Sequence, residues 1–157
     1  MDFATIFRLE ENLNLDKKTL VFLRWIAIFG QLFSVNLVYF FLDLNFPVLL
    51  CHIIISIGLI TNIYLQFGLK ATLLKDLYSS SFLMYDIIQL SILLFLTGGI
   101  FNPFAILLIV PTIVSSTFLS TGSTIILGSA TIFLLFILTF FNMPLPGMEE
   151  YILSFPN

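Results

Sequence analysis

The sequence has few charged side chains and almost none of the residues that bind metals or carry redox chemistry. Only 10% of its 157 residues are charged, and it contains one histidine, His52, and one cysteine, Cys51. A single histidine and a single cysteine cannot build a dedicated metal site, and one cysteine cannot form a disulfide within the chain. Cys51 lies in an apolar run, which favours a small apolar residue over a redox switch.

The motifs of common soluble enzymes are absent as well. The sequence has no GxxxxGK(S/T) phosphate-binding loop, no CxxC pair and no HExxH motif. His52 has no carboxylate nearby in the chain to orient it beside a serine, so a hydrolase fits poorly. Basic patches interleaved with aromatic residues are also missing. We therefore expect no catalytic residues in this chain and no nucleic-acid partner.

Apolar residues, in contrast, are abundant. Hydrophobic residues make up 59% of the chain, nineteen residues are Phe, and the mean hydropathy is +1.11. A soluble domain of this length could not bury so much apolar surface in its core. The N-terminus is not a cleavable signal peptide, because Asp2, Glu10, Glu11 and Asp16 precede the first long apolar run. The composition predicts an all-α integral membrane protein in contact with lipid.

Five apolar segments are each about long enough to cross a bilayer. We expect membrane spans at about residues 19–42, 47–67, 80–97, 103–120 and 124–141, which together form one transmembrane domain, 19–141. Pro111 inside the fourth segment predicts a kink. Residues 1–18 form a lead-in that is either a short amphipathic helix on the membrane surface or a loose tail, and residues 142–157 form a second tail.

The positive charges indicate how the bundle is oriented. All six Lys and Arg residues fall on one side of the predicted bundle: Arg8, Lys17, Lys18, Arg24, Lys70 and Lys75. By the positive-inside rule that side is the cytoplasm, so we expect a cytoplasmic N-terminus. Five spans then place the tail 142–157 in the periplasm.

Two ionisable residues lie inside the predicted spans, where a charge is costly and usually paired or functional. Arg24 and Asp86 both lie roughly 8–9 Å inside the cytoplasmic boundary at 1.5 Å per helical residue, and Asn62 reaches a similar depth. We expect these three residues to form a polar cluster in which Arg24 and Asp86 are paired. The alternative for Arg24 is snorkelling of its guanidinium to the headgroups.

Several uncharged polar residues also lie within the spans. Asn36 and His52 reach comparable depth near the opposite face, where they would either contact a ligand held near Asn102 or make interhelical hydrogen bonds. The second interpretation is favoured. The same interpretation applies to Gln31, Gln89 and residues 115–117.

The stretch GGIFNPF, residues 98–104, interrupts the apolar segments between the third and fourth spans. Gly98 and Gly99 can adopt backbone angles that a side chain forbids, and Asn102-Pro103 is a turn-starting pair. On spacing alone, the favoured interpretation is a tight turn between two spans. The alternative is a surface site, in which Phe101 and Phe104 would suit a ligand with an apolar tail and a polar head.

This stretch resembles the GGxxNPF heptapeptide of the RegB/PrrB-type redox-sensing histidine kinases, with all five fixed letters matched. Residues 19–32, TLVFLRWIAIFGQL, are similar to the first span of that family, where an LRW…GQ pattern is typical. Residues 62–65 and 86–99 also fit, as do Pro111 and the PLP at 144–146. The resemblance covers nearly all of the chain from residue 19 to residue 146.

The resemblance implies a sensor region without its kinase. Members of the family have six membrane spans, then a dimerisation helix with the phosphorylated histidine, then an ATP-binding domain. This sequence ends where the sixth span is expected and has neither kinase module. It is thus expected to be the input part of a two-component, ATP-dependent histidine kinase, a homodimer in the bacterial inner membrane that would act on a response regulator through the missing kinase part.

The resemblance also implies a ligand, because the family's heptapeptide interacts with membrane quinone. It identifies ubiquinone or another membrane quinone as the expected ligand and transfers five loop residues as its contacts: Gly98, Gly99, Asn102, Pro103 and Phe104. Phe101, Asn36 and His52 are further candidate contacts.

Three other functions compete with a quinone sensor. A small carrier or channel component would explain the polar residues in the spans, but there is no pair of broken helices and no charged pore ring. A membrane subunit of a respiratory enzyme would need haem-ligating histidines on facing helices, and this chain has one histidine. A ligand-free structural module is distinguished from the sensor by the absence of quinone binding.

Overall fold

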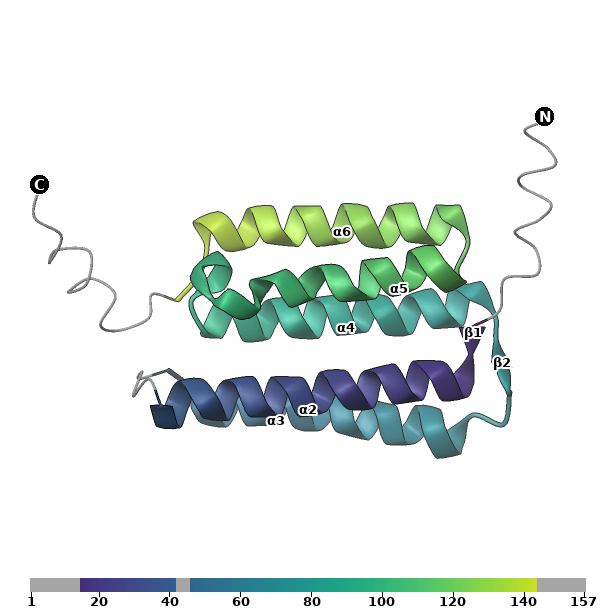
Figure 1. Cartoon of the computed structure of the whole chain (residues 1–157), viewed down its shortest axis with the longest axis horizontal. Helices are drawn as coiled ribbons and strands as arrows, with labels where there is room; N and C mark the ends of the chain where they lie inside the picture. The colour runs from purple at the N-terminus through teal and green to yellow at the C-terminus, as the bar shows by residue number, and fades with distance from the viewer. Residues whose placement is uncertain (1–14, 42–45, 144–157) are drawn as a thin grey trace, which may run out of the picture.

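The computed structural model describes residues 15–41 and 46–143, which form a helical bundle (Figure 1). Five α-helices make up most of it: α2 (Lys17–Phe41), α3 (Val48–Ile63), α4 (Asp76–Leu96), α5 (Val110–Phe118) and α6 (Thr121–Phe140). The shorter elements are the π-helix η2 (Tyr64–Gly68), the 3-10 helices η3 (Gly99–Phe101) and η4 (Pro103–Ile109), and the strands β1 (Leu15–Asp16) and β2 (Leu73–Leu74).

The helices form two groups. The hairpin α2–α3 lies against a group made of α4, α5 and α6 (Figure 1). Helix α4 is the central element, with 44% of its apolar window buried against 17–28% for the other three long helices. Cys51 is fully buried in a cluster between α2, α3 and α4 that includes Ile28, Ile55 and Leu93. It packs there as a small apolar side chain.

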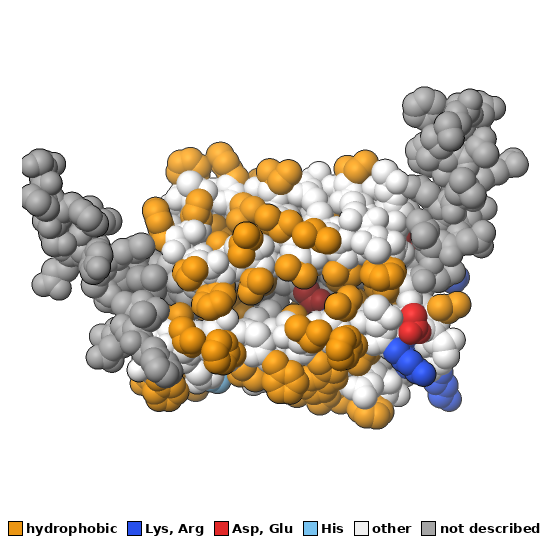
Figure 2. Space-filling view, in the orientation of Figure 1, with side chains coloured by type: hydrophobic (Ala, Val, Ile, Leu, Met, Phe, Trp, Pro, Cys, Tyr) orange, Lys and Arg blue, Asp and Glu red, His pale blue; other side chains and the backbone are white. Residues whose placement is uncertain are grey.

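Within residues 15–41 and 46–143, four helices are long and apolar enough to cross a membrane: Lys17–Phe40, Val48–Gly68, Asp76–Leu96 and Thr121–Phe140. Large hydrophobic side chains cover the outside of the bundle (Figure 2), as expected of a protein surrounded by lipid. An all-α membrane bundle is therefore the fold. The first and third helices begin earlier than predicted, at Lys17 rather than residue 19 and at Asp76 rather than residue 80. An acidic side chain at position 76 favours an early start, because it complements the positive helix N-terminus.

The fourth predicted span is built differently from the others. It consists of seven residues of 3-10 helix in η4 followed by nine residues of α-helix in α5. Pro111 has no N–H and would clash with the carbonyl of Leu107 in a continuous α-helix. Instead the Leu107 carbonyl accepts from the Val110 N–H, and the helix type changes at Val110, one residue before the Pro111 at which the sequence predicts a kink. With rises of 2.0 and 1.5 Å per residue, this segment is about 27 Å long, close to the hydrocarbon thickness.

A small sheet, which the sequence did not predict, closes one end of the bundle. Strands β1 and β2 pair antiparallel, with Leu15 opposite Leu74 and Asp16 opposite Leu73. The pairing ties the residues before α2 to the connection between α3 and α4. Two residues per strand are too short for any periodic pattern in the sequence. The rest of the predicted lead-in, residues 1–14, and residues 144–157 of the tail lie outside the described residues.

The two ends of the bundle differ in chemistry. Lys17 donates its backbone N–H to the Thr72 carbonyl beside the sheet, and Lys18, Lys70 and Lys75 belong to the same end. Figure 2 shows the basic side chains of this face gathered there. The 98–104 loop lies at the opposite end, after α4 (Figure 1).

Candidate functional site

Two glycines shape the start of the 98–104 loop. Gly98 and Gly99 have φ angles of 100° and 60°, in the left-handed region that a side chain disfavours. Gly98 follows the last residues of α4 and turns the chain away from the helix. At Gly99 a Cβ atom would lie 2.5 Å from Cβ of Asn142 and 2.9 Å from the Leu138 carbonyl oxygen. Both the backbone angle and the close packing against the end of α6 therefore require glycine at position 99.

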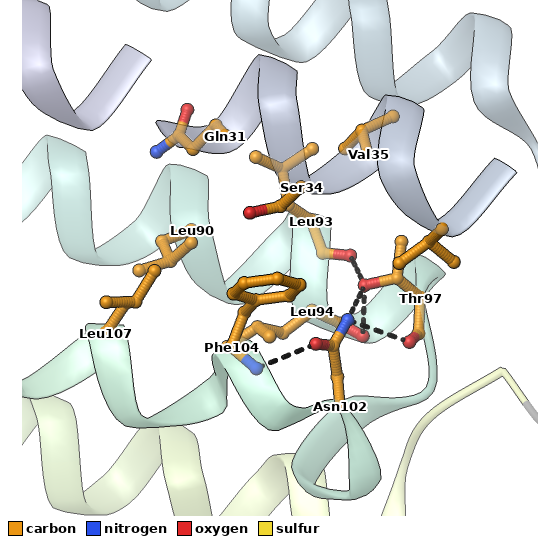
Figure 3. A pocket seen from close by; sticks show the side chains of 11 residues that line it. Gln31, Ser34, Val35, Leu90, Leu93, Leu94, Thr97, Asn102, Phe104 and Leu107 are labelled. Carbon is orange, nitrogen blue, oxygen red and sulfur yellow. Dashed lines mark hydrogen bonds between the residues drawn. The ribbon is translucent and has the colours of Figure 1, made fainter. Parts of the chain in front are cut away.

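The Asn102 side chain holds the loop together (Figure 3). Its Oδ1 accepts from the Phe104 N–H at 2.9 Å and so caps η4. Its Nδ2 donates to Oγ1 and to the carbonyl of Thr97, at 2.8 and 3.1 Å. Asn102 is buried, and both of its amide hydrogens are used within the chain. A ligand that needs a donor from this amide would have to break the contact with Thr97.

The cavity beside Asn102 is small. It has a volume of about 30 Å³ and lies between α2, α4 and η4, with the Phe104 ring on one side (Figure 3). That volume suits about one water molecule and is too small for a quinone ring. Phe101 is 65% exposed and Pro103 is exposed, so the accessible surface of the loop is its outer side.

Deeper in the bundle, the structure brings Arg24 and Asp86 together. Nε and Nη2 of Arg24 lie 3.1 and 3.0 Å from Oδ1 of Asp86, which joins α2 to α4. The Arg24 side chain is only 3% exposed, so its guanidinium does not snorkel within the described structure. The rings of Phe82 and Tyr85 lie 5.2 and 5.6 Å from its Cζ, close enough for cation–π attraction.

The third member of this cluster is not the predicted one. Nη2 of Arg24 donates to Oγ1 of Thr61 at 2.9 Å, whereas Asn62 points elsewhere and donates to the Val21 carbonyl at 3.4 Å. Thr61 was missed because depth in the membrane does not fix rotation about the helix axis, and adjacent residues face directions about 100° apart.

Comparison with known proteins gives a match to a sensor histidine kinase. The chain is 36% identical over 141 residues, 89% of its length, to the sensor histidine kinase RegB of Cereibacter sphaeroides. The chain is RegB-like. It spans 30% of the length of that protein. No family model matches the sequence, and no solved structure matches it.

In this RegB-like chain, the interhelical hydrogen bonding predicted for Gln31 and for Gln89 is confirmed, and the two residues are each other's partners. Nε2 of Gln89 on α4 donates to Oε1 of Gln31 on α2 at 2.9 Å. Gly58 on α3 makes room for this pair, because a Cβ atom there would lie 2.5 Å from the Gln89 amide. Helices α2, α3 and α4 therefore meet at this polar contact as well as at the Arg24 cluster.

The other predicted interhelical bonds are wrong. Asn36 donates to the Leu32 carbonyl at 2.7 Å, and Nδ1 of His52 donates to the Val48 carbonyl at 2.9 Å, each within its own helix. Residues 115–117 likewise bond to carbonyls one turn back in α5. Short polar side chains on a helix readily reach such carbonyls, which removes the need for a partner helix. Neither Asn36 nor His52 lines the cavity beside Asn102.

Proposed function

We propose that this chain is the membrane input domain of a RegB-type, redox-responsive sensor histidine kinase, and that it senses membrane quinone through the 98–104 loop. The observation that carries the proposal is the 36% identity to RegB across 89% of the chain. The kinase module that would bind ATP, dimerise and phosphorylate a response regulator would lie in the remainder of the protein. This role places the chain in the bacterial inner membrane.

The arrangement of the bundle supports this role in two ways. If Pro103–Phe118 is a fifth span, the lysine end faces the cytoplasm and the 98–104 loop faces the periplasm. An exposed Phe101 on a loop held rigid by Asn102 offers a flat apolar surface at the membrane boundary. A neutral ring with an apolar tail would pack on that outer surface rather than in the small cavity.

The 3-10 helix η4 is a suitable element to relay the signal. A ligand shifts an equilibrium only by its differential affinity for two states, so the loop must have two arrangements. Runs of 3-10 helix as long as seven residues are uncommon and have poorer hydrogen-bond geometry than an α-helix. Rewinding η4 as an α-helix would shorten it by about 3.5 Å, at 0.5 Å per residue. In this mechanism one redox state of the quinone favours one winding of η4.

The test is quinone binding to the purified chain in lipid nanodiscs. Phe101→Ala should weaken saturable binding by about two- to tenfold, the value of one lost aromatic contact. Phe67→Ala is the matched control, because Phe67 is 76% exposed at the opposite end of the bundle. Asn102→Ala is a poorer probe, since it also releases the loop. Equal binding by all variants would refute the loop as the site, and no saturable binding would favour a ligand-free module or a small transporter component.

A further inference from the structure

A second and larger cavity lies beside the Arg24–Asp86 pair. It has a volume of about 290 Å³ and lies between α2 on one side and α4, η4 and α5 on the other. That is close to the lower limit of 300 Å³ for pockets that hold small ligands. Figure 2 shows an acidic side chain recessed among hydrophobic ones in the middle of the face between these groups. We call this cavity the crevice.

The crevice wall carries hydrogen-bonding groups that the described residues do not use. Arg24 contacts Oδ1 of Asp86 only, and Oδ2 has no hydrogen-bond partner within the described ranges; 17% of the side chain is exposed. Gln31 uses its Oε1 to accept from Gln89, while its Nε2 donates to no described residue. Nη1 of Arg24 also lacks a partner in this part of the chain, but it has almost no accessible surface and so is not offered to the crevice. One free acceptor and one free donor therefore border an otherwise apolar space.

Gly30 independently supports the presence of a ligand in the crevice. It lies in the interior of α2, where glycine costs about 1 kcal/mol relative to alanine. A Cβ atom at this position would meet nothing within 4 Å, so packing among the described residues does not require glycine. Gly30 lines the crevice. Glycine in a helix that faces an open cavity allows a ligand to approach the backbone closely.

The charges of the crevice restrict the class of ligand. Arg24 and Asp86 neutralise each other, so the wall offers no net charge to attract an ion. The remaining lining is mostly apolar, including Leu20, Ala27, Leu83 and Val110. The matching ligand is neutral and lipophilic, about the size of one substituted ring, with a hydroxyl that donates to Asp86 and an oxygen that accepts from Gln31.

We propose that the crevice is a binding site for a neutral, hydroxyl-bearing ring molecule from the membrane, of the phenol or hydroquinone class. Identifying the ligand as the reduced form of the sensed quinone rests on the proposed function. An oxidised quinone has no hydroxyl to donate to Asp86, so the crevice would prefer the reduced form. Gln31, Leu90 and Leu107 line both this crevice and the small cavity beside Asn102, which links occupancy of the crevice to the loop.

Filling the crevice from Gly30 tests the proposal. The probes are a benzoquinol with one isoprene unit and its oxidised form, titrated into the full chain in nanodiscs. Gly30→Leu places a branched side chain in the crevice, and Gly30→Ala is the matched control that leaves most of the space free. Both changes raise helix propensity, so both variants should fold, which circular dichroism checks. Gly30→Leu should weaken quinol binding at least tenfold, whereas Gly30→Ala should bind as the native chain does.

The outcomes separate this site from the loop. Native binding of quinol by Gly30→Leu, or an equal loss in both Gly30 variants, would overturn the crevice as the site. A crevice filled only by lipid chains would give no saturable quinol binding that responds to Gly30→Leu, which also overturns the proposal. If quinone binds and only Phe101→Ala weakens it, the crevice proposal fails while the proposed function stands. If neither probe binds the native chain, both fail.

Discussion

Removing the Asp86 carboxylate should cost more stability than removing the whole ion pair. Asp86→Ala leaves the guanidinium of Arg24, which is 3% exposed, without its counter-charge. Breaking a buried pair in this way costs about 3–5 kcal/mol, whereas replacing both partners by apolar residues is often close to neutral. We expect about 3 kcal/mol for Asp86→Ala, at the low end because Thr61 and two aromatic rings still contact Arg24.

The double change Arg24→Met/Asp86→Leu should lose much less, within about 1.5 kcal/mol of the native chain. Arg24→Met alone should fall between the two, because the remaining Asp86 side chain is 17% exposed and open to the crevice. The assay is reversible unfolding with sodium dodecyl sulfate in mixed micelles, followed by the fluorescence of Trp25, the single tryptophan. A cost below about 1 kcal/mol for Asp86→Ala would refute the reasoning, because the pair would then be no stronger than an ordinary interhelical hydrogen bond.

Three further changes test other contacts by the same unfolding assay or by hydrogen exchange. Gly58→Ala should cost about 1–2 kcal/mol, because the added Cβ displaces the buried Gln89 amide from its partner. Gly99→Ala should cost about 2 kcal/mol or more, since alanine at a φ of 60° is strained and its Cβ meets the end of α6. Asp76→Asn should increase hydrogen exchange in the first turn of α6, because the Asp76 carboxylate accepts from the N–H and hydroxyl of Ser120 at 2.8 and 2.9 Å.

Two other glycines provide matched controls for the glycine changes. At Gly128 a Cβ atom would make an ordinary 3.5 Å contact with Thr112, so Gly128→Ala should be neutral or stabilising. Gly122→Ala meets only the Ser120 hydroxyl at 4.0 Å and should behave in the same way. Destabilisation by either control equal to that of Gly58→Ala or Gly99→Ala would show that close packing is not the cause. For Asp76→Asn the amides in the last turn of α6 are the internal reference and should not change.

The contacts that could be predicted from the sequence are those made by side chains that are rare in a membrane span. Arg24 and Asp86 stand out because opposite charges in apolar runs need each other, and Gln31 and Gln89 stand out because large amides there need partners. Thr61 could not be selected in the same way, because a threonine hydroxyl can always donate to a backbone carbonyl one turn back in its own helix. Asn36 and His52 were misread for a related reason, since a carbonyl one turn back satisfied each of them.

The fold was predictable to the extent that it follows from apolar length. Four of the five predicted spans correspond to long α-helices, because about twenty apolar residues leave few alternatives in a bilayer. The remaining predicted span, 103–120, agrees only in part, because the sequence of η4 does not distinguish a 3-10 helix from an α-helix. Pairing of β1 with β2 depends on residues about sixty positions apart and on only two residues per strand, so nothing local in the sequence indicates it.

Helix α4 contacts the start of α6, both polar pairs with α2, and the 98–104 loop. Asp76 in its first turn holds the start of α6, Asp86 holds Arg24, and Gln89 holds Gln31. Thr97, directly after its end, holds Asn102 and hence the 98–104 loop. The helix is about 31 Å long at 1.5 Å per residue, so these contacts are spread over the thickness of a membrane. A displacement of the loop would be passed along α4 to the lysine end, which under the proposed function is the side of the membrane that carries the kinase.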